Sequence, residues 1–257
     1  MQLINKDLDL SRFYQSVETA SHRILMLDYD GTLAPFTVER DKAYPYPGVR
    51  EILSELVSSH RTRLVVISGR SVRDLVELLQ LAQLPELFGS HGLERMSASG
   101  GYVSIEVDER IRHGLARIGR WIEQEGLADR TEIKPFGFAF HWRGLPEEQE
   151  AAIRGKVREK WQYTADDFGL VLREFDGGLE IRINTIDKGT AVCKIIDGAP
   201  EDTAIAYLGD DDTDEDAFGA LGGRGLSVLV SGQSRKTVAD MRIEPPGELL
   251  DFIRRWV

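Results

Sequence analysis

The segment Ile24–Phe36, ILMLDYDGTLAPF, decides how this chain folds. Its first four residues are apolar and suit a buried strand, which stops at two aspartates, Asp28 and Asp30, on either side of a tyrosine. One aspartate is enough to end a strand in a turn, because its short side chain bonds the nearby backbone. A second acid two residues later therefore indicates chemistry as well as structure.

Strand-like and helix-like patterns alternate through the first hundred residues. The apolar strand Ile24–Leu27 is followed by an amphipathic helix over 47–60, an apolar strand over 64–67 and a helix over 71–80 that Ser71 would cap. Short apolar strands separated by amphipathic helices predict an α/β fold with a parallel sheet covered on both faces.

The pattern changes after the glycine pair Gly100–Gly101. The strands that follow, beginning with YVSIEV, alternate polar and apolar residues, and two amphipathic helices separate them. Such alternation is typical of a sheet with one covered face, so residues 102–184 are predicted to form a smaller α+β domain. The buried pattern returns after Asp187, which predicts a core made of residues 1–101 and 185–257 with the smaller domain inserted.

Composition narrows the classes of partner. With 42% hydrophobic and 29% charged residues the chain reads as globular, and its net charge of -11 argues against nucleic acid and anionic membranes. No membrane-length apolar run or signal-peptide core is present, so we expect a cytoplasmic protein. The single cysteine, Cys193, lies in a helical pattern and is expected to be a packed, inert thiol.

Polar residues follow the predicted strands where a parallel sheet gathers its ligand-binding residues, outside the carboxyl ends. Four strand ends carry them: Asp28 and Asp30 after ILML, Ser68 after LVVI, Lys188 soon after LEIRI, and Asp210 with Asp211 after AIAYLG. Carboxylates bind a hard cation, and a lysine with a serine binds an anion. Mg²⁺ suits such a site, because it is bound through one or two carboxylates together with phosphate oxygens. One acid of DYD can then attack phosphorus while the other handles the proton.

Four segments, LDYDGTLAPF, VVISGR, DKGTAV and YLGDDDTDEDAF, resemble in order the motifs of haloacid-dehalogenase (HAD) superfamily phosphatases. The segments SGR, GSHGLER, FHWRG and LEIR further resemble those of trehalose-6-phosphate phosphatases. The resemblance extends from Arg23 to Phe218. It implies a HAD-like, Rossmann-like parallel-sheet core with an inserted α+β cap that sets substrate specificity.

The resemblance also implies roles for the core residues. Asp28 is the nucleophile that forms an aspartyl-phosphate, and Asp30 is the general acid and base, with its backbone carbonyl toward the metal. Ser68 and Lys188 hold the phosphoryl oxygens. The metal ligands are Asp28, Asp30 and Asp210, and Asp211 and Asp214 support them.

Substrate-binding roles are implied for residues of both domains: Arg70, His91 and Glu94 in the core, and Lys134, His141, Arg143, Glu180 and Arg182 in the cap. Glu180 and Arg182 share one face of the last cap strand. By strand parity, Lys134 lies on the face opposite His141 unless a turn at 135–137 resets the register.

Simpler interpretations exist for single motifs. Asp-x-Asp-Gly is a common turn, and DDDTDEDAF could be a solvated helix start. It is not a calcium loop, because its twelfth residue is Leu221 instead of Glu and its sixth is Glu215 instead of Gly. Four motifs in the right order favour phosphoryl transfer over separate turns.

The function that we predict is Mg²⁺-dependent hydrolysis of trehalose 6-phosphate. Sucrose phosphate and glucosyl- or mannosyl-glycerate phosphate remain alternative substrates, and a non-catalytic sugar-phosphate sensor is a further alternative. A phospho-receiver domain also gathers acids and a lysine, but it would not need so large an insertion. The sequence leaves the oligomeric state open.

Overall fold

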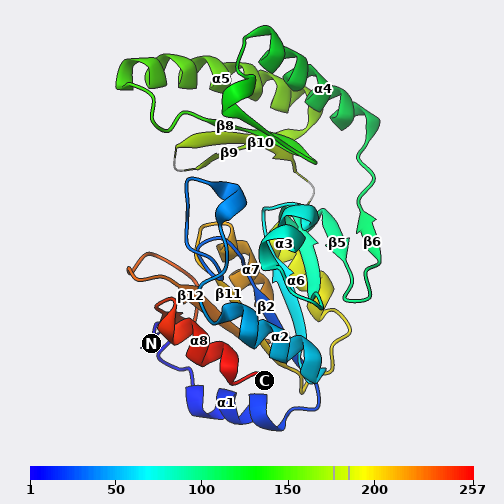
Figure 1. Cartoon of the computed structure of the whole chain (residues 1–257), viewed down its shortest axis with the longest axis vertical. Helices are drawn as coiled ribbons and strands as arrows, with labels where there is room; N and C mark the ends of the chain where they lie inside the picture. Colours follow the sequence, from blue (N-terminus) through cyan, green and yellow to red (C-terminus); the bar gives the residue numbers. More distant parts are fainter. Residues whose placement is uncertain (176, 185) are drawn as a thin grey trace. The chain divides into compact units, whose positions relative to one another are not determined.

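The computed structural model describes residues 1–175, 177–184 and 186–257 (Figure 1). The chain divides into two compact units: the core, Met1–Ser104 with Ile186–Val257, and the inserted unit, Ile105–Thr185. Residue 185, where the second core segment was predicted to begin, lies outside the described residues.

A mixed sheet forms the centre of the core, and its strands run in the order β1-β13-β12-β11-β2-β3-β4-β5-β6. The stretch from β13 to β4 is parallel, whereas β1, β5 and β6 pair antiparallel at the two edges. The strands are β1 (Gln2–Leu3), β2 (Arg23–Leu27), β3 (Arg63–Ile67), β4 (Glu86–Gly89), β5 (Glu94–Met96), β6 (Tyr102–Ser104), β11 (Ala204–Gly209), β12 (Leu226–Val230) and β13 (Met241–Ile243). The predicted α/β class with a largely parallel sheet is confirmed.

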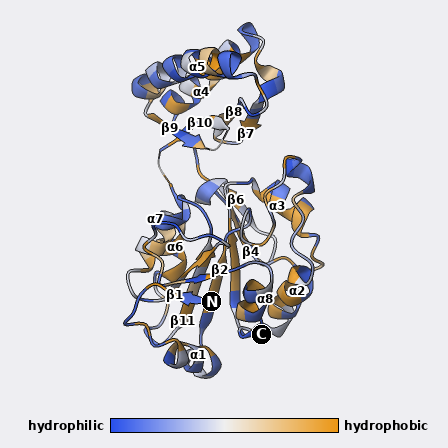
Figure 2. Ribbon diagram, turned by 90° about the vertical axis from the view of Figure 1, so that its left-hand side faces the viewer, coloured by the Kyte–Doolittle hydropathy of each residue, from blue (hydrophilic) through white to orange (hydrophobic). Residues whose placement is uncertain are grey.

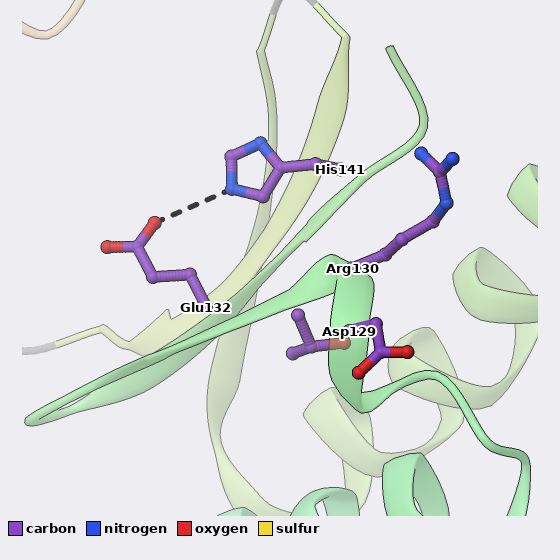
Figure 3. A pocket seen from close by; sticks show the side chains of 5 residues that line it. Asp129, Arg130, Glu132 and His141 are labelled. Atoms are coloured by element: carbon purple, nitrogen blue, oxygen red, sulfur yellow. Dashed lines mark ion pairs between the residues drawn. The ribbon is translucent and has the colours of Figure 1, made fainter. Parts of the chain in front are cut away.

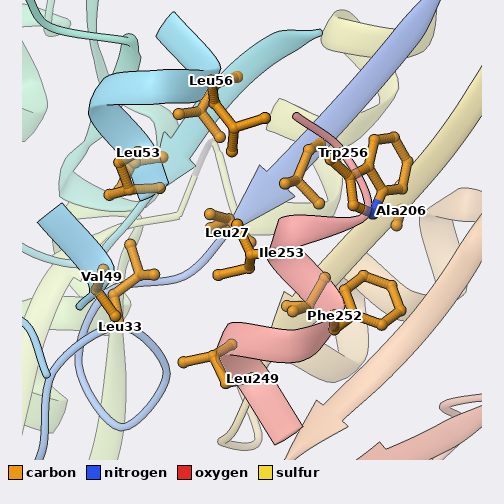
Figure 4. Close-up of a cluster of buried hydrophobic side chains, with 14 of the residues drawn as sticks. Leu27, Leu33, Val49, Leu53, Leu56, Ala206, Leu249, Phe252, Ile253 and Trp256 are labelled. Carbon is orange, nitrogen blue, oxygen red and sulfur yellow. The ribbon is translucent and has the colours of Figure 1, made fainter. Parts of the chain in front are cut away.

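Helices cover both faces of this sheet, because alternate strand residues point to opposite sides. In β2, Leu25 and Leu27 face one hydrophobic cluster, while Ile24 and Met26 face the other. The first cluster packs under α1 (Leu10–Thr19), α2 (Val49–Ser59), α3 (Val72–Leu79) and α8 (Gly247–Arg254), and Figure 4 shows part of it. The second packs under α6 (Lys188–Ile196) and α7 (Asp214–Leu221). Apolar strands thus lie inside polar-faced helices, as Figure 2 shows.

Tyr102–Ser104 belongs to the core sheet, so the prediction that it opens the inserted domain is wrong. It forms β6, which pairs antiparallel with β5. The glycine pair before it sits in the connecting turn, where the Gly100 amide donates to the Ser97 carbonyl at 2.8 Å. Gly100–Gly101 marks a hairpin instead of a domain boundary.

The inserted unit is a four-stranded antiparallel sheet, in the order β7-β8-β10-β9, with two helices. Its elements are α4 (Glu109–Gln124), β7 (Thr131–Lys134), β8 (Gly137–His141), α5 (Glu147–Phe168), β9 (Leu170–Phe175) and β10 (Gly178–Ile183). Short 3-10 helices occupy Ala128–Arg130 in this unit, and Arg40–Lys42 and Ser90–Gly92 in the core. Leu179, Ile181 and Ile183 are buried on one face of β10, as period-two alternation requires.

Two further predictions need correction. Lys188 does not follow a strand of the parallel sheet, since LEIRI lies in β10 of the inserted unit and Lys188 begins α6 instead. Cys193 is exposed, because the period of α6 turns Val192 and Ile196 inward and leaves the thiol outside. In the described part of the chain, no helix is both long and apolar enough to span a membrane.

Candidate active site

Three neighbouring strands bring the predicted catalytic residues to one edge of the core sheet. Strands β11, β2 and β3 are adjacent and parallel, and Asp210, Asp28 and Ser68 follow their last residues directly. The Asp28 amide donates to the Leu208 carbonyl at 2.8 Å, which fixes the nucleophile candidate beside β11. The sheet therefore creates the crevice that the sequence indicated.

Lys188 reaches the same edge from the start of α6. Asp187 caps this helix and accepts from the Thr190 amide at 2.7 Å, which places Lys188 in the first turn. The buried Lys188 ammonium donates to Asp28 Oδ1 at 2.8 Å and to Asp214 Oδ1 at 2.7 Å. Burial lowers the pKa of Lys188, but the two carboxylates outweigh burial and raise this pKa well above its ordinary value. The two carboxylates therefore favour the charged form of this lysine.

Asp214 connects more groups than the sequence suggested. One carboxylate oxygen accepts from Lys188 and from the Tyr207 hydroxyl at 2.5 Å, and the other accepts from the amides of Asp210 and Asp211 at 3.0 Å each. Asp214 is fully buried. Its hydrogen bonds hold the lysine, the acidic loop and β11 in one arrangement, so it acts as a positioning residue.

Asp28, Asp210 and Asp214 can each offer an oxygen such that all these atoms lie within 4.8 Å of one another. Asp210 Oδ1 is buried and has no hydrogen-bond partner among the described residues. Burial, and then the charges of Asp28 and Asp214, raise the pKa of Asp210 to about 10. Excess negative charge and an unsatisfied carboxylate oxygen fit a hard divalent cation such as Mg²⁺.

Two glycines permit this close grouping of acids. Gly31 has φ +81°, and a Cβ there would lie 2.1 Å from Asp210 Oδ2. A Cβ on Gly209 would lie 2.2 Å from the Asp214 carboxyl carbon. Any side chain at either position would push an acid out of place, which explains the glycine of DYDG in physical terms.

Asp30 is held in a different way. Its carboxylate oxygens accept from Arg70 Nε and Nη2 at 2.7 Å each, and Arg70 also donates to the Arg40 carbonyl. Arg70 is buried, with its guanidinium over the Tyr29 ring. The Asp30 side chain lies outside the three-acid group, so its predicted metal contact concerns the backbone carbonyl alone.

The remaining predicted core residues occupy the loops beside β3 and β4. Ser68 is buried, and its Oγ accepts from the Arg70 amide at 3.1 Å. His91 has φ +58° and lies over Gly69, where a Cβ would be 2.7 Å from its Nε2. Glu94 accepts from the hydroxyls of Ser90 at 2.6 Å and Tyr102 at 2.9 Å, so it braces this loop.

In the inserted unit, the predicted substrate residues share the face of the sheet opposite the helices. Lys134 pairs with Gly137 across a hairpin, so the turn resets the register and brings Lys134 to the face of His141. The Lys134 ammonium donates to Glu180 Oε1 at 2.7 Å. Arg182, two residues after Glu180, is the next residue on this face of β10 and is buried.

His141 lies with Glu132 in a hollow of about 710 Å³ that Asp129, Arg130 and Thr131 also line (Figure 3). His141 Nε2 and Glu132 Oε2 are 3.5 Å apart. Arg143 follows β8 in an exposed turn, where its amide donates to the Gly177 carbonyl at 3.3 Å. This face of the inserted unit therefore carries both signs of charge.

Two positioning residues escaped the sequence reasoning. Tyr207 lies inside the apolar strand β11, and the one available signal was that it shares a strand face with Gly209, which directly precedes Asp210. Arg235 donates to the carbonyls of Asp210 at 3.2 Å and Asp211 at 2.8 Å, and it pairs with Glu215 at 2.6 Å. Asp211 itself accepts from the Thr213 amide and hydroxyl, so it shapes the loop.

Two trehalose-phosphate phosphatases are similar in sequence to most of the chain. It is 28% identical over 271 residues to trehalose-phosphate phosphatase B of Arabidopsis thaliana, covering 96% of this chain and 70% of that protein. It is 29% identical over 248 residues to the trehalose-phosphate phosphatase of Mycobacterium tuberculosis, covering 90% of this chain and 60% of that protein. The chain thus spans less than two thirds of the mycobacterial protein.

Solved structures share the fold. The C-terminal domain of Candida albicans trehalose-6-phosphate phosphatase superposes with a TM-score of 0.77 at 21% identity, covering 98% of each chain. A haloacid dehalogenase-like hydrolase from Bacillus subtilis superposes with a TM-score of 0.60 at 16% identity, covering 86% of this chain and 94% of that one. The predicted HAD-like fold is thereby confirmed.

The family model described as trehalose-phosphatase matches residues 26–243, which include both motif-bearing segments of the core and the whole inserted unit. The chain therefore belongs to the trehalose-phosphatase family, a family of phosphoric monoester hydrolases.

Proposed function

We propose that this protein hydrolyses trehalose 6-phosphate to trehalose and phosphate, with a divalent cation, in the cytoplasm. The observation that carries the proposal is the grouping of the buried Asp28 and Lys188 with the half-buried Asp210, beside the carboxyl ends of β2 and β11, in a chain of this family. Asp28, Asp210 and the Asp30 carbonyl would hold Mg²⁺, which supplies positive charge opposite the phosphoryl oxygens.

The reaction would proceed through two displacements at phosphorus. Asp28 attacks the phosphoryl group, the bond to the sugar oxygen breaks, and Asp30 gives its proton to that oxygen. Water then attacks the aspartyl-phosphate while Asp30 accepts its proton, which releases phosphate and restores Asp28. Lys188 and Ser68 hold the phosphoryl oxygens throughout.

Arg70 binds both oxygens of Asp30, so it competes with the two proton transfers that Asp30 would carry out. We therefore propose that the substrate phosphate or sugar draws Arg70 away, since a guanidinium also binds phosphate in a bidentate manner. In this structure the predicted general acid and base, Asp30, and the predicted substrate-binding residue, Arg70, are thus each other's partners.

The Asp30→Asn variant tests this division of labour. Nitrophenyl phosphate leaves without much help from an acid, so its first displacement should survive and the second should stall. We expect a burst of nitrophenol and a phosphoryl adduct on Asp28 by mass spectrometry of acid-quenched protein. Asp28→Asn should show neither, and steady turnover of Asp30→Asn at the parental rate would exclude Asp30 as the base.

We also propose that the inserted unit acts as the cap that recognises the sugar, through Lys134, Glu180 and Arg182 with His141 and Arg143. Glu180→Ala should weaken hydrolysis of trehalose 6-phosphate and spare an aryl phosphate, because remote binding energy helps only a substrate that reaches it. Equal losses on both substrates would mean a structural role. Comparison with sucrose phosphate and with glucosyl- and mannosyl-glycerate phosphates measures the preference.

A further inference from the structure

A cavity of about 370 Å³ lies at the amino-terminal edge of the core sheet. Its lining includes residues at or just before the starts of β2, β3 and β11, among them Arg23, Arg61 and Thr203. The predicted catalytic residues follow the other ends of these same strands. Because a five-residue strand is about 17 Å long, the cavity is separate from the three-acid group.

The lining of this cavity is basic in a chain whose net charge is -11. It includes Arg23, Arg61 and Arg63 together with His22 and His60. Arg63 already pairs with Glu86 at 2.8 Å and donates to the Ile195 carbonyl, so its charge is matched. Among the described residues that line the cavity, Asp197 is the one acid.

Arg23 and Thr203 are the unusual members. Arg23 is 6% exposed, yet its side chain has neither an ion pair nor a hydrogen bond with any residue that the structure describes. Burial and the like charge of Arg61 lower the pKa of Arg23. Thr203 is 7% exposed, and its hydroxyl also lacks a hydrogen-bond partner within the described ranges.

Buried charges in proteins are normally paired, and buried hydroxyls are normally hydrogen-bonded, because leaving them unsatisfied costs free energy. Here one cavity holds the buried, unpartnered hydroxyl of Thr203 and the guanidinium of Arg23, beside a second arginine, Arg61, to which the described part of the chain provides no ion pair. A ligand that accepts hydrogen bonds and carries negative charge would satisfy all of them. Guanidinium groups match the oxygens of phosphate particularly well, in charge and in geometry.

We propose that this cavity is a second binding site for a phosphate-type anion, distinct from the catalytic edge of the sheet. The cavity volume lies within the range of about 300 to 1,000 Å³ that is typical of small-molecule sites. It exceeds the volume of one phosphate, so an organic group on the phosphorus also has room. The site does not depend on the proposed substrate.

The NMR signals of the histidine rings provide a direct test, because the chain has five histidines and two of them, His22 and His60, line the cavity. The full-length protein is titrated at constant pH, with chelator, against inorganic phosphate or methylphosphonate, whose P–C bond resists hydrolysis. The His22 and His60 ring signals, assigned with single His→Gln variants, should shift and saturate. Tighter binding of methylphosphonate would identify an organic phosphate as the ligand, and tighter binding of phosphate the inorganic ion.

Three variants make the test specific. Arg61→Ala, an exposed change that leaves Arg23 in place, should weaken binding about tenfold through loss of a charged hydrogen bond. Arg120→Ala removes the same charge from the inserted unit and should leave binding unchanged. Ser68→Ala should leave the His22 and His60 shifts unchanged, since these report the cavity and not the catalytic edge. Ring signals that do not move, or equal weakening by Arg61→Ala and Arg120→Ala, would overturn the proposal.

Discussion

Replacing Gly31 with alanine tests whether the acids must approach the DYDG turn as closely as they do. Gly31 has φ +81°, and an added Cβ would lie 2.1 Å from Asp210 Oδ2 and 2.3 Å from its carboxyl carbon. Asp210 would have to move. Gly100 offers a matched control, because it has φ +86° and nothing lies within 4 Å of its added Cβ.

The two substitutions share one cost and differ in another. A left-handed backbone costs an alanine about 1–2 kcal/mol, so Gly100→Ala should lower the free energy of unfolding by roughly that amount. Gly31→Ala should lower it by a further amount of about 1–3 kcal/mol, the usual cost of overpacking. Displacing Asp210 should also weaken Mg²⁺ binding by about 10- to 100-fold, as lost positioning of a metal ligand generally does.

Urea unfolding of both variants measures the stability change, and phosphate release over a Mg²⁺ titration measures the metal affinity. Gly100→Ala should keep the parental dependence on Mg²⁺, whereas Gly31→Ala should need much more Mg²⁺ for half-maximal activity. The reasoning is refuted if the two variants lose equal stability and share one Mg²⁺ dependence.

Two other predictions follow from the same buried group. Tyr207→Phe removes a hydroxyl that donates to the Asp214 carboxylate, so it should lower the free energy of unfolding in urea by about 1.5–3 kcal/mol. Tyr29 is equally buried but donates to a neutral carbonyl, so Tyr29→Phe should lower it by about 0.5–1.5 kcal/mol. Equal losses in the two variants would contradict a charged network. Without metal, burial raises the pKa of Asp210 to about 10, so the native state holds a proton that the unfolded chain loses near pH 4. The free energy of unfolding in chelator should therefore fall between pH 6 and 9, and Mg²⁺ should flatten this fall; thermal melts with the same pH slope in both conditions would argue against a cation at Asp210.

The sequence was sufficient for the parallel strands β2, β3, β11 and β12 of the core, because their signals are local. Ile24–Leu27 and Leu64–Ile67 are apolar without interruption, which only strands covered on both faces require. Once the sheet is parallel, the residues after those strands must meet at one edge, so Asp28 and Ser68 could be placed together from order alone.

The misassigned elements have non-local causes. Tyr102–Ser104 alternates polar and apolar residues like the strands of the inserted unit, and only its pairing with β5 assigns it to the core. Lys188 was credited to a strand end because LEIRI precedes it closely, although that strand pairs with β8 and β9. Local patterns specify the type of an element, but the partner strand specifies the sheet to which it belongs.

Pairing between functional residues lay furthest beyond the sequence. Arg70 and Asp30 are 40 positions apart, and Lys134 and Glu180 are 46 apart, yet each pair is joined by hydrogen bonds of 2.7 Å. Residue type indicated that each side chain suits a sugar phosphate, but residue type cannot reveal that these opposite charges pair with one another in the folded chain. Such pairs reduce the cost of burying charge, since a buried charge without a partner is strongly destabilising. Under the proposed function, a substrate that binds Arg70 or Glu180 must replace one of these ion pairs, so part of its binding energy offsets the lost pair.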